Sequence, residues 1–129
     1  MLGVIKLSAR AAFAVGIAIV IWASLASHED LPLTVNVWDK LQHTLAYGAL
    51  AIAGIVGFPD RRGLLGVGIG LVALGAGLEV VQALTPSRKA GLDDGLANVI
   101  GVTLGLAIGW LAARLVGLRQ DGGGGSRAS

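Results

Sequence analysis

The run Gly95–Ala113, GLANVIGVTLGLAIGWLAA, contains no charged residue. A helix that spans a membrane needs about 20 mostly apolar residues, so this run is long enough to form one. Three earlier stretches share its character, although the second contains His43 and the third contains Glu79. We therefore expect four membrane-spanning helices, at about 11–27, 41–59, 64–84 and 95–114.

The composition of the whole chain agrees with this expectation. Of its 129 residues, 54% are hydrophobic, 14% are charged and 21 are glycine. A soluble domain carries about 25% charged residues and about 7% glycine, and a small domain has too little interior to hide so much apolar surface. These values exclude a soluble enzyme, a disordered chain and a fibrous protein. The absence of cysteine excludes disulfides, thiolate catalysis and Cys-ligated metals.

We expect the fold to be all-α, a compact bundle of four transmembrane helices. Glycine and alanine are too frequent, and strand-forming residues too unevenly spaced, for a β-barrel. Only helices and closed barrels satisfy their backbone hydrogen bonds in lipid. Residues 1–120 form the single predicted domain, and 121–129 have the glycine-rich composition of a flexible linker.

The distribution of charge predicts the orientation in the membrane. Lysine and arginine collect at the two ends of the chain and in the second loop, at Lys6, Arg10, Arg61, Arg62, Arg114 and Arg119. The first loop is mostly acidic, with Glu29, Asp30 and Asp39. The positive-inside rule then places both termini in the cytoplasm and the first and third loops outside. Trp22 and Trp38 would lie near the outer interface and Trp110 near the inner one.

The first apolar stretch has a second interpretation. Lys6 and Arg10 precede an apolar run that ends in Ser24-Leu25-Ala26, which is typical of a cleaved signal peptide. An uncleaved first helix is the interpretation that we favour.

Small residues recur at a spacing of four in the last two predicted helices. Gly101, Gly105 and Gly109 form one ridge, and Gly66, Gly70, Ala73 and Gly77 form another. Close backbone approach is a main source of helix association in lipid. We expect these ridges to be contact faces within the bundle, with a homo-oligomer through Gly101, Gly105 and Gly109 as the alternative.

Polar residues in the predicted spans converge at the outer end. Asp39, His43 and Tyr47 are spaced by four and share a helix face, flanked by Lys40 and Gln42. The third span carries Glu79 and Gln82 near its end, the fourth begins with Asp94 and Asn98, and the loop between them holds Arg88 and Lys89. Polar groups in lipid are costly, so this convergence predicts a functional site.

The order of these residues resembles the VanZ-like family. The segments that carry the resemblance are WDKLQHTLAY at 38–47, Glu79-Val-Val-Gln82, Pro86-Ser-Arg88, Asp94, and Asn98-Val-Ile-Gly101. They cover nearly all of the chain from 38 to 110. One departure is Lys89-Ala-Gly-Leu after Arg88, where relatives often have serine or aromatic residues. The resemblance implies a small multi-pass protein of the bacterial cytoplasmic membrane, from a family named for resistance to the glycopeptide teicoplanin.

Two functional classes follow for this outer cluster. The first is a non-enzymatic envelope protein that binds or shields an anionic lipid or a lipid-linked envelope precursor. Its ligand-binding residues would be Asp39, Lys40, His43, Tyr47, Glu79, Gln82, Arg88, Asp94 and Asn98. The second is an intramembrane enzyme in which Glu79, His43 and Asp94 act as acid and base groups. We favour the binder, whose partners are membrane lipids and not nucleic acid.

Other chemistry fits the sequence less well. Glu79 has a purely structural interpretation, as the ion-pair partner of Arg88, Lys40 or protonated His43. His43, Glu79 and Asp94 are of types that bind zinc or manganese, but no HExxH-like spacing is present, so we expect no metal and no cofactor. Arg88 is the best candidate to hold an anionic group, because its planar fork matches phosphate or carboxylate.

Overall fold

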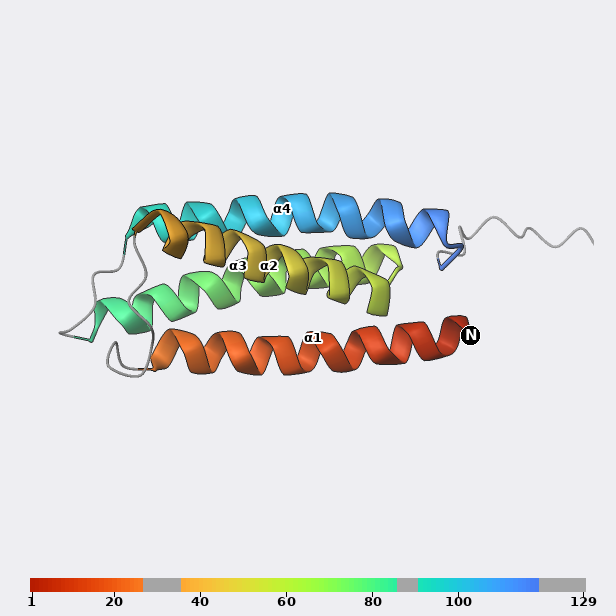
Figure 1. The fold of residues 1–129 in the computed structure, drawn as a ribbon, viewed down its shortest axis with the longest axis horizontal. Helices are drawn as coiled ribbons and strands as arrows, with labels where there is room; N and C mark the ends of the chain where they lie inside the picture. The colour runs from red at the N-terminus through yellow and green to blue at the C-terminus, as the bar shows by residue number, and fades with distance from the viewer. Residues whose placement is uncertain (27–35, 86–90, 119–129) are drawn as a thin grey trace, which may run out of the picture.

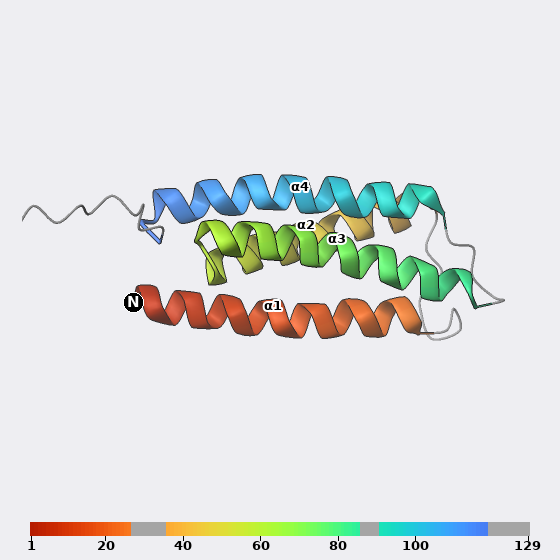
Figure 2. The same ribbon diagram turned by 180° about the vertical axis from the view of Figure 1, so that it is seen from behind.

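The computed structural model describes residues 1–26, 36–85 and 91–118, with residues 36–39 described by their backbone alone. These ranges form four α-helices: α1 (Leu2–Leu25), α2 (Asn36–Gly57), α3 (Arg61–Ala83) and α4 (Leu92–Leu115). The helices lie alongside one another as a bundle (Figure 1 and Figure 2). The prediction of an all-α fold with four helices is confirmed.

Two local interactions define the start of α3 and the end of α4, which lie at the end of the bundle near Met1. The side chain of Asp60 caps α3 by accepting a hydrogen bond from the backbone N–H of Gly63 at 2.6 Å. After α4, Gly117 adopts a positive φ of 72°, which is easy for glycine. That turn lets the N–H of Leu118 donate to the carbonyl of Ala113 at 2.9 Å and buries the Leu118 side chain.

Three of the described helices, α1, α3 and α4, are long and apolar enough to cross a membrane. Their exposed surfaces carry many large apolar side chains, such as Ile19, Ile69 and Leu104. Contiguous apolar surface of this kind is rare on soluble monomers and suits contact with lipid. The helix α2 has the length, at 22 residues, but is not among the three, because its first half contains Lys40, Gln42 and His43.

The glycine ridge of α4 packs against α2 within the same chain. Gly101, Gly105 and Gly109 are all buried. A Cβ atom added to Gly101 would collide with the carbonyl oxygen of Thr44, and one added to Gly105 would collide with the carbonyl oxygen of Gly48. Within the chain, this ridge is therefore occupied by α2.

The glycine ridge of α3 does not pack inside the bundle, and the expectation that it would do so was wrong. Gly66, Gly70 and Gly77 are exposed, and a Cβ atom added to any of them meets nothing within 4 Å. The buried face of α3 instead consists of Val67, Leu71, Gly75 and Leu78. This row is one residue out of step with the glycine ridge, which corresponds to a rotation of about 100° around a helix with 3.6 residues per turn.

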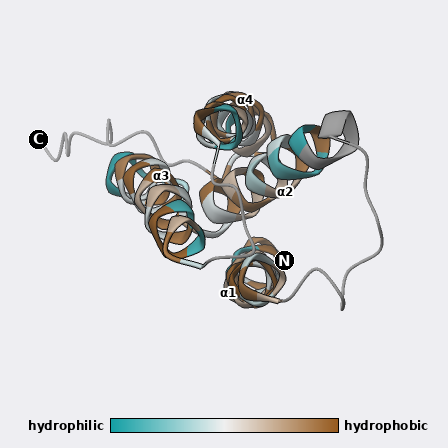
Figure 3. Cartoon of the chain, turned by 90° about the vertical axis from the view of Figure 1, so that its left-hand side faces the viewer, coloured by the Kyte–Doolittle hydropathy of each residue, from teal (hydrophilic) through white to brown (hydrophobic). Residues whose placement is uncertain are grey.

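The helix α1 lies at the periphery of the bundle. It contacts α2 and α3 but has no close backbone contact with α4 within the described ranges, and α4 lies across from it when the bundle is viewed end on (Figure 3). No residue of α1 is fully buried. Arg10 attaches its N-terminal half by donating from Nε to the carbonyl of Gly57 at 2.9 Å and by stacking on Phe58.

Candidate functional site

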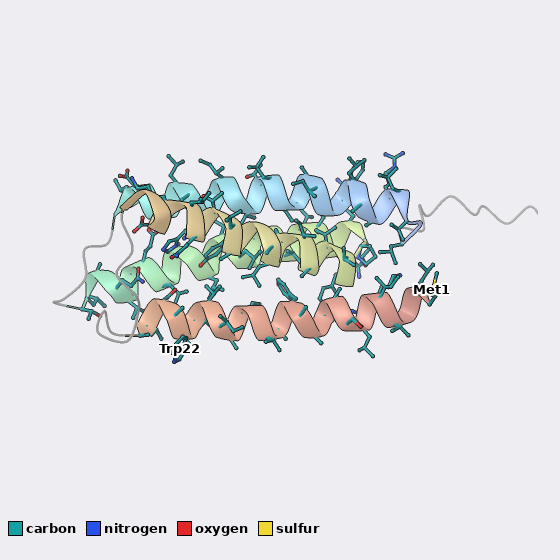
Figure 4. All side chains as sticks on the ribbon, viewed as in Figure 1. Met1 and Trp22 are labelled. Carbon is teal, nitrogen blue, oxygen red and sulfur yellow. The ribbon has the colours of Figure 1, made fainter. Side chains whose placement is uncertain are left out.

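The polar cluster forms where the start of α2, the end of α3 and the start of α4 meet. These segments lie at the end of the bundle opposite Met1 (Figure 1 and Figure 4). Side-chain oxygen and nitrogen atoms lie among the carbon atoms between the helices at this end (Figure 4). Trp22, which is 62% exposed, points outward from α1 at the same end (Figure 4).

The helices α2 and α4 are joined here by side-chain hydrogen bonds. Nδ1 of His43 donates to Oδ1 of Asn98 at 3.1 Å, because a carboxamide oxygen only accepts. The hydroxyl of Thr44, one residue along, donates to the carbonyl of Ala97 at 3.3 Å. The imidazole of His43 is thereby held at the interface of the two helices.

Tyr47 and Asn98 form the floor of the cluster. Both side chains are buried, at 2% and 4% exposure, and they meet against Gly75 of α3. A Cβ atom added to Gly75 would lie 3.0 Å from Nδ2 of Asn98 and 3.3 Å from the hydroxyl of Tyr47. Gly75 therefore leaves room for two polar groups beside α3.

Glu79 lies one turn further along α3, and its carboxylate rests against the first turn of α4. A Cβ atom added to Gly95 would lie 2.8 Å from Oε1 of Glu79 and 3.0 Å from Oε2. The N-terminal turn of a helix favours a carboxylate through its N–H groups and its dipole. Oε1 is nevertheless buried and has no hydrogen-bond partner among the described residues.

Two described residues, Asp94 of α4 and His43 of α2, influence the charge of Glu79. Both interact with it electrostatically, Asp94 as a like charge and His43 as an opposing influence. The three groups proposed from the sequence as acid and base candidates are therefore neighbours. Among the described residues, however, no three His, Asp or Glu side chains are arranged closely enough to hold a metal ion.

An exposed ion pair marks the rim of the cluster. Nζ of Lys40 donates to Oδ2 of Asp93 at 2.9 Å, and both side chains are largely exposed. The pair links the first part of α2 to the first turn of α4 at this rim.

The described structure brings together most of the residues predicted for the site. His43, Tyr47, Glu79, Asp94 and Asn98 form the cluster, with Lys40 at its rim. Gln82 differs from the expectation, because its amide donates to the carbonyl of Ser24 at 3.0 Å and so ties α3 to α1. The side chain of Asp39, and all of Arg88 and Lys89, lie outside the described residues.

Sequence reasoning missed three residues that shape the site, namely Thr44, Gly75 and Gly95. Each lies beside a predicted residue in the sequence or on the helix: Thr44 follows His43, Gly95 follows Asp94, and Gly75 precedes Glu79 by one helical turn. That proximity was the available signal. The glycines act through the space that they leave, which becomes visible only when the neighbouring helix is in place.

The chain matches no family model, no curated protein and no solved structure.

Proposed function

We propose that this chain is a VanZ-like integral protein of the bacterial cytoplasmic membrane, crossing it four times with both termini in the cytoplasm. The described charges support this orientation. Lys6, Arg10, Arg61, Arg62 and Arg114 gather at the end of the bundle near Met1, with Asp60 as the one described acid there. Lys40 at the opposite end is accompanied by Asp39, Glu79, Asp93 and Asp94, and loops rich in lysine and arginine stay inside.

The fourth crossing is made by α2. Its polar first half is shielded by neighbouring helices, since His43 and Thr44 bond to α4 and Tyr47 is buried. Its second half is apolar and packs against Gly105 and Gly109 of α4. Polar side chains in a membrane almost always face the bundle interior in this way. Low overall hydropathy is therefore compatible with a spanning helix here.

The cluster at the outer leaflet binds or shields the headgroup of an anionic lipid or of a lipid-linked envelope precursor. The observation that carries this proposal is the Oε1 atom of Glu79, which is buried without a hydrogen-bond partner among the described residues. An unsatisfied buried acceptor costs about 1–3 kcal/mol. A ligand with a hydroxyl or ammonium donor would remove that cost and gain binding energy in doing so.

The surrounding groups suit the remaining parts of such a headgroup. Asp94 is a second acceptor near Glu79, and sugar hydroxyls or an ammonium group offer donors to both. Lys40 at the rim supplies positive charge for a phosphate. Arg88, placed by sequence in the adjoining loop, would add a bidentate guanidinium.

The test displaces the Glu79 carboxylate without changing any polar group. In Gly95→Ala, the new Cβ lies within 3.0 Å of Oε1, so the flexible carboxylate must move while the helices stay in place. Gly77→Ala is the matched control, because its Cβ meets nothing within 4 Å. We expect Gly95→Ala to weaken binding of the full chain to vesicles containing a polyprenyl phosphate that carries a sugar, whose hydroxyls are the donors, and to lower teicoplanin tolerance in a sensitive host. Equal binding by both variants would refute the proposal.

A second function is suggested by Asp94 and His43, which both act electrostatically on Glu79, because acid–base catalysis uses carboxylate and imidazole groups of this kind. In this alternative the protein is an intramembrane enzyme acting on a lipid-linked substrate. Loss of a positioned proton-transfer group lowers a rate by roughly 10²–10⁴-fold while leaving binding largely intact. Glu79→Gln and His43→Gln separate the two functions. If these two variants keep lipid binding but lose teicoplanin tolerance, the enzyme is favoured. If Arg88→Lys reduces lipid binding more than either of them, the binder is favoured.

A further inference from the structure

A second feature of the molecule opens at the other end of the bundle, near Met1. A groove with a volume of about 590 Å³ runs between α1 and α3. Its walls are apolar, with Phe13 and Ile17 on α1 and Leu74 on α3, and its floor includes Gly66 and Gly70. Arg62 and Asp60 lie at its N-terminal mouth. The volume is within the range of pockets that bind small ligands, about 300–1,000 Å³.

The groove exists because two residues of α3 have no side chain. Gly66 and Gly70 are exposed, and a Cβ atom at either position would meet nothing within 4 Å. The helix α1 is held close to the start of α3 nonetheless, because Phe13 meets Phe58, in the connection between α2 and α3, edge to face, and Arg10 stacks on the same ring. A gap between α1 and α3 thus remains at the end of the bundle near Met1.

The length of the groove matches one leaflet of a membrane. From Arg62 to Leu74 the chain advances twelve residues, or about 18 Å along a helix at 1.5 Å per residue. Half of a hydrocarbon core about 30 Å thick is about 15 Å. Arg62 would then lie at the level of the lipid headgroups, and the apolar walls would extend towards the middle of the bilayer.

The charges at the mouth indicate which headgroup fits. Asp60 is occupied as the cap of α3, where it accepts from the backbone of Gly63. Arg62 makes no ion pair or hydrogen bond with another described residue, so its guanidinium is available to an anion. The first turn of α3 adds its N–H groups and dipole, which also favour phosphate.

We infer that this groove binds one acyl chain of an anionic phospholipid from the cytoplasmic leaflet, with the lipid phosphate held at Arg62. A helix of a second copy is the competing occupant. A helix with its side chains is about 10–12 Å wide. Because α1 of the same chain already forms one side of this groove, a second helix would have to displace it. A single flexible acyl chain fits between two helices that remain in contact, and basic pockets between membrane helices on the cytoplasmic side commonly bind anionic lipids.

The test measures lipid retained by the full chain in detergent, using native mass spectrometry. Dioleoyl phosphatidylglycerol and dioleoyl phosphatidylcholine are supplied in equal amounts. We expect one phosphatidylglycerol per chain, in clear preference to phosphatidylcholine. Arg62→Gln should reduce phosphatidylglycerol retention by roughly fivefold, the contribution of one cation near an anionic lipid. Arg61→Gln is the matched control and should leave retention unchanged, because Arg61 does not line the groove.

A second pair of variants tests the groove itself. Gly70→Leu fills it, and because each buried methylene of the chain contributes to binding, retention of both lipids should fall at least about tenfold. Gly77→Leu makes the same chemical change outside the groove and should have no effect. Gly66→Leu repeats the test if Gly70→Leu folds poorly. The inference is overturned if wild type retains both lipids equally, if Gly70→Leu and Gly66→Leu retain lipid like Gly77→Leu, or if Gly70→Leu abolishes a dimer.

Discussion

The close approach of α2 and α4 predicts that a single added methyl group will destabilise the bundle. In Gly105→Ala, the new Cβ would collide with the carbonyl oxygen of Gly48 and would lie 2.7 Å from Cβ of Ala51 and 2.9 Å from Cα of Gly48. Two of these contacts are backbone atoms, so the clash is relieved only if the helices separate. Overpacking of this kind costs about 1–3 kcal/mol. Separation would also weaken the hydrogen bond between His43 and Asn98, which spans the same interface.

Gly77→Ala is the control, since its Cβ meets nothing within 4 Å. Alanine is favoured over glycine in a helix by about 0.8–1.0 kcal/mol, so this variant should be slightly more stable than wild type. Thermal unfolding in detergent, followed by circular dichroism, should therefore give opposite shifts, a decrease of several degrees for Gly105→Ala and a small increase for Gly77→Ala. Equal increases for both variants would refute the reasoning, because they would show that the interface accommodates the methyl group.

Two further predictions concern the orientation and the floor of the site. A cysteine at Thr85 should react with an impermeant thiol reagent added to intact cells, whereas one at Ser8 should react only after lysis; the reverse pattern would invert the proposed orientation, and the chain offers a cysteine-free background. Asn98→Ala should lower the melting temperature more than Thr103→Ala, because Asn98 is buried and bonds across helices while the exposed Thr103 bonds only to its own helix through Val99. A hydrogen bond between membrane helices is worth roughly 0.6 kcal/mol. A larger fall in melting temperature for Thr103→Ala would therefore contradict the placement of Asn98 in the floor of the cluster.

The sequence allowed the number of helices to be predicted, but not which side of α3 faces the bundle. Interruptions by charge and proline separate four apolar runs, and this signal does not depend on tertiary structure. The orientation of α3 is harder, because lipid and protein interior are both apolar. The glycine ridge through Gly66 and the buried row through Val67 are equally compatible with the sequence, and only the positions of the other helices distinguish them.

The candidate site, like the fold, could be predicted only in part from the sequence. Polar residues such as His43, Glu79 and Asn98 could be identified because each is costly inside an apolar run and therefore needs a partner or a function. The partners themselves could not be identified. Gln82 fits the same face as Glu79 by spacing, yet it bonds to Ser24 because α1 passes within reach of it. Which helix lies beside a given residue depends on packing over the whole bundle.

The last prediction concerns why Glu79 is a carboxylate at all. A structural ion pair was one interpretation of this residue. Of the three partners considered, Lys40 pairs with Asp93, Arg88 lies outside the described residues, and His43 acts favourably on the Glu79 charge without satisfying Oε1, which has no hydrogen-bond partner among the described residues. The charge of Glu79 also interacts unfavourably with that of Asp94. Glu79→Gln removes this repulsion, keeps the shape of the side chain and adds an amide donor that Asp94 can accept from.

We therefore expect Glu79→Gln to raise the melting temperature of the ligand-free protein in detergent, by about 4 °C if the gain is near 1 kcal/mol. The same variant should bind vesicles containing the sugar-bearing polyprenyl phosphate more weakly, because an amide offers one fewer acceptor to the sugar hydroxyls. Greater stability with weaker binding is the trade-off expected of a residue kept for function. A fall in melting temperature would show instead that a cation holds Glu79 in the folded protein, and the residue would then contribute to the fold and not to ligand binding.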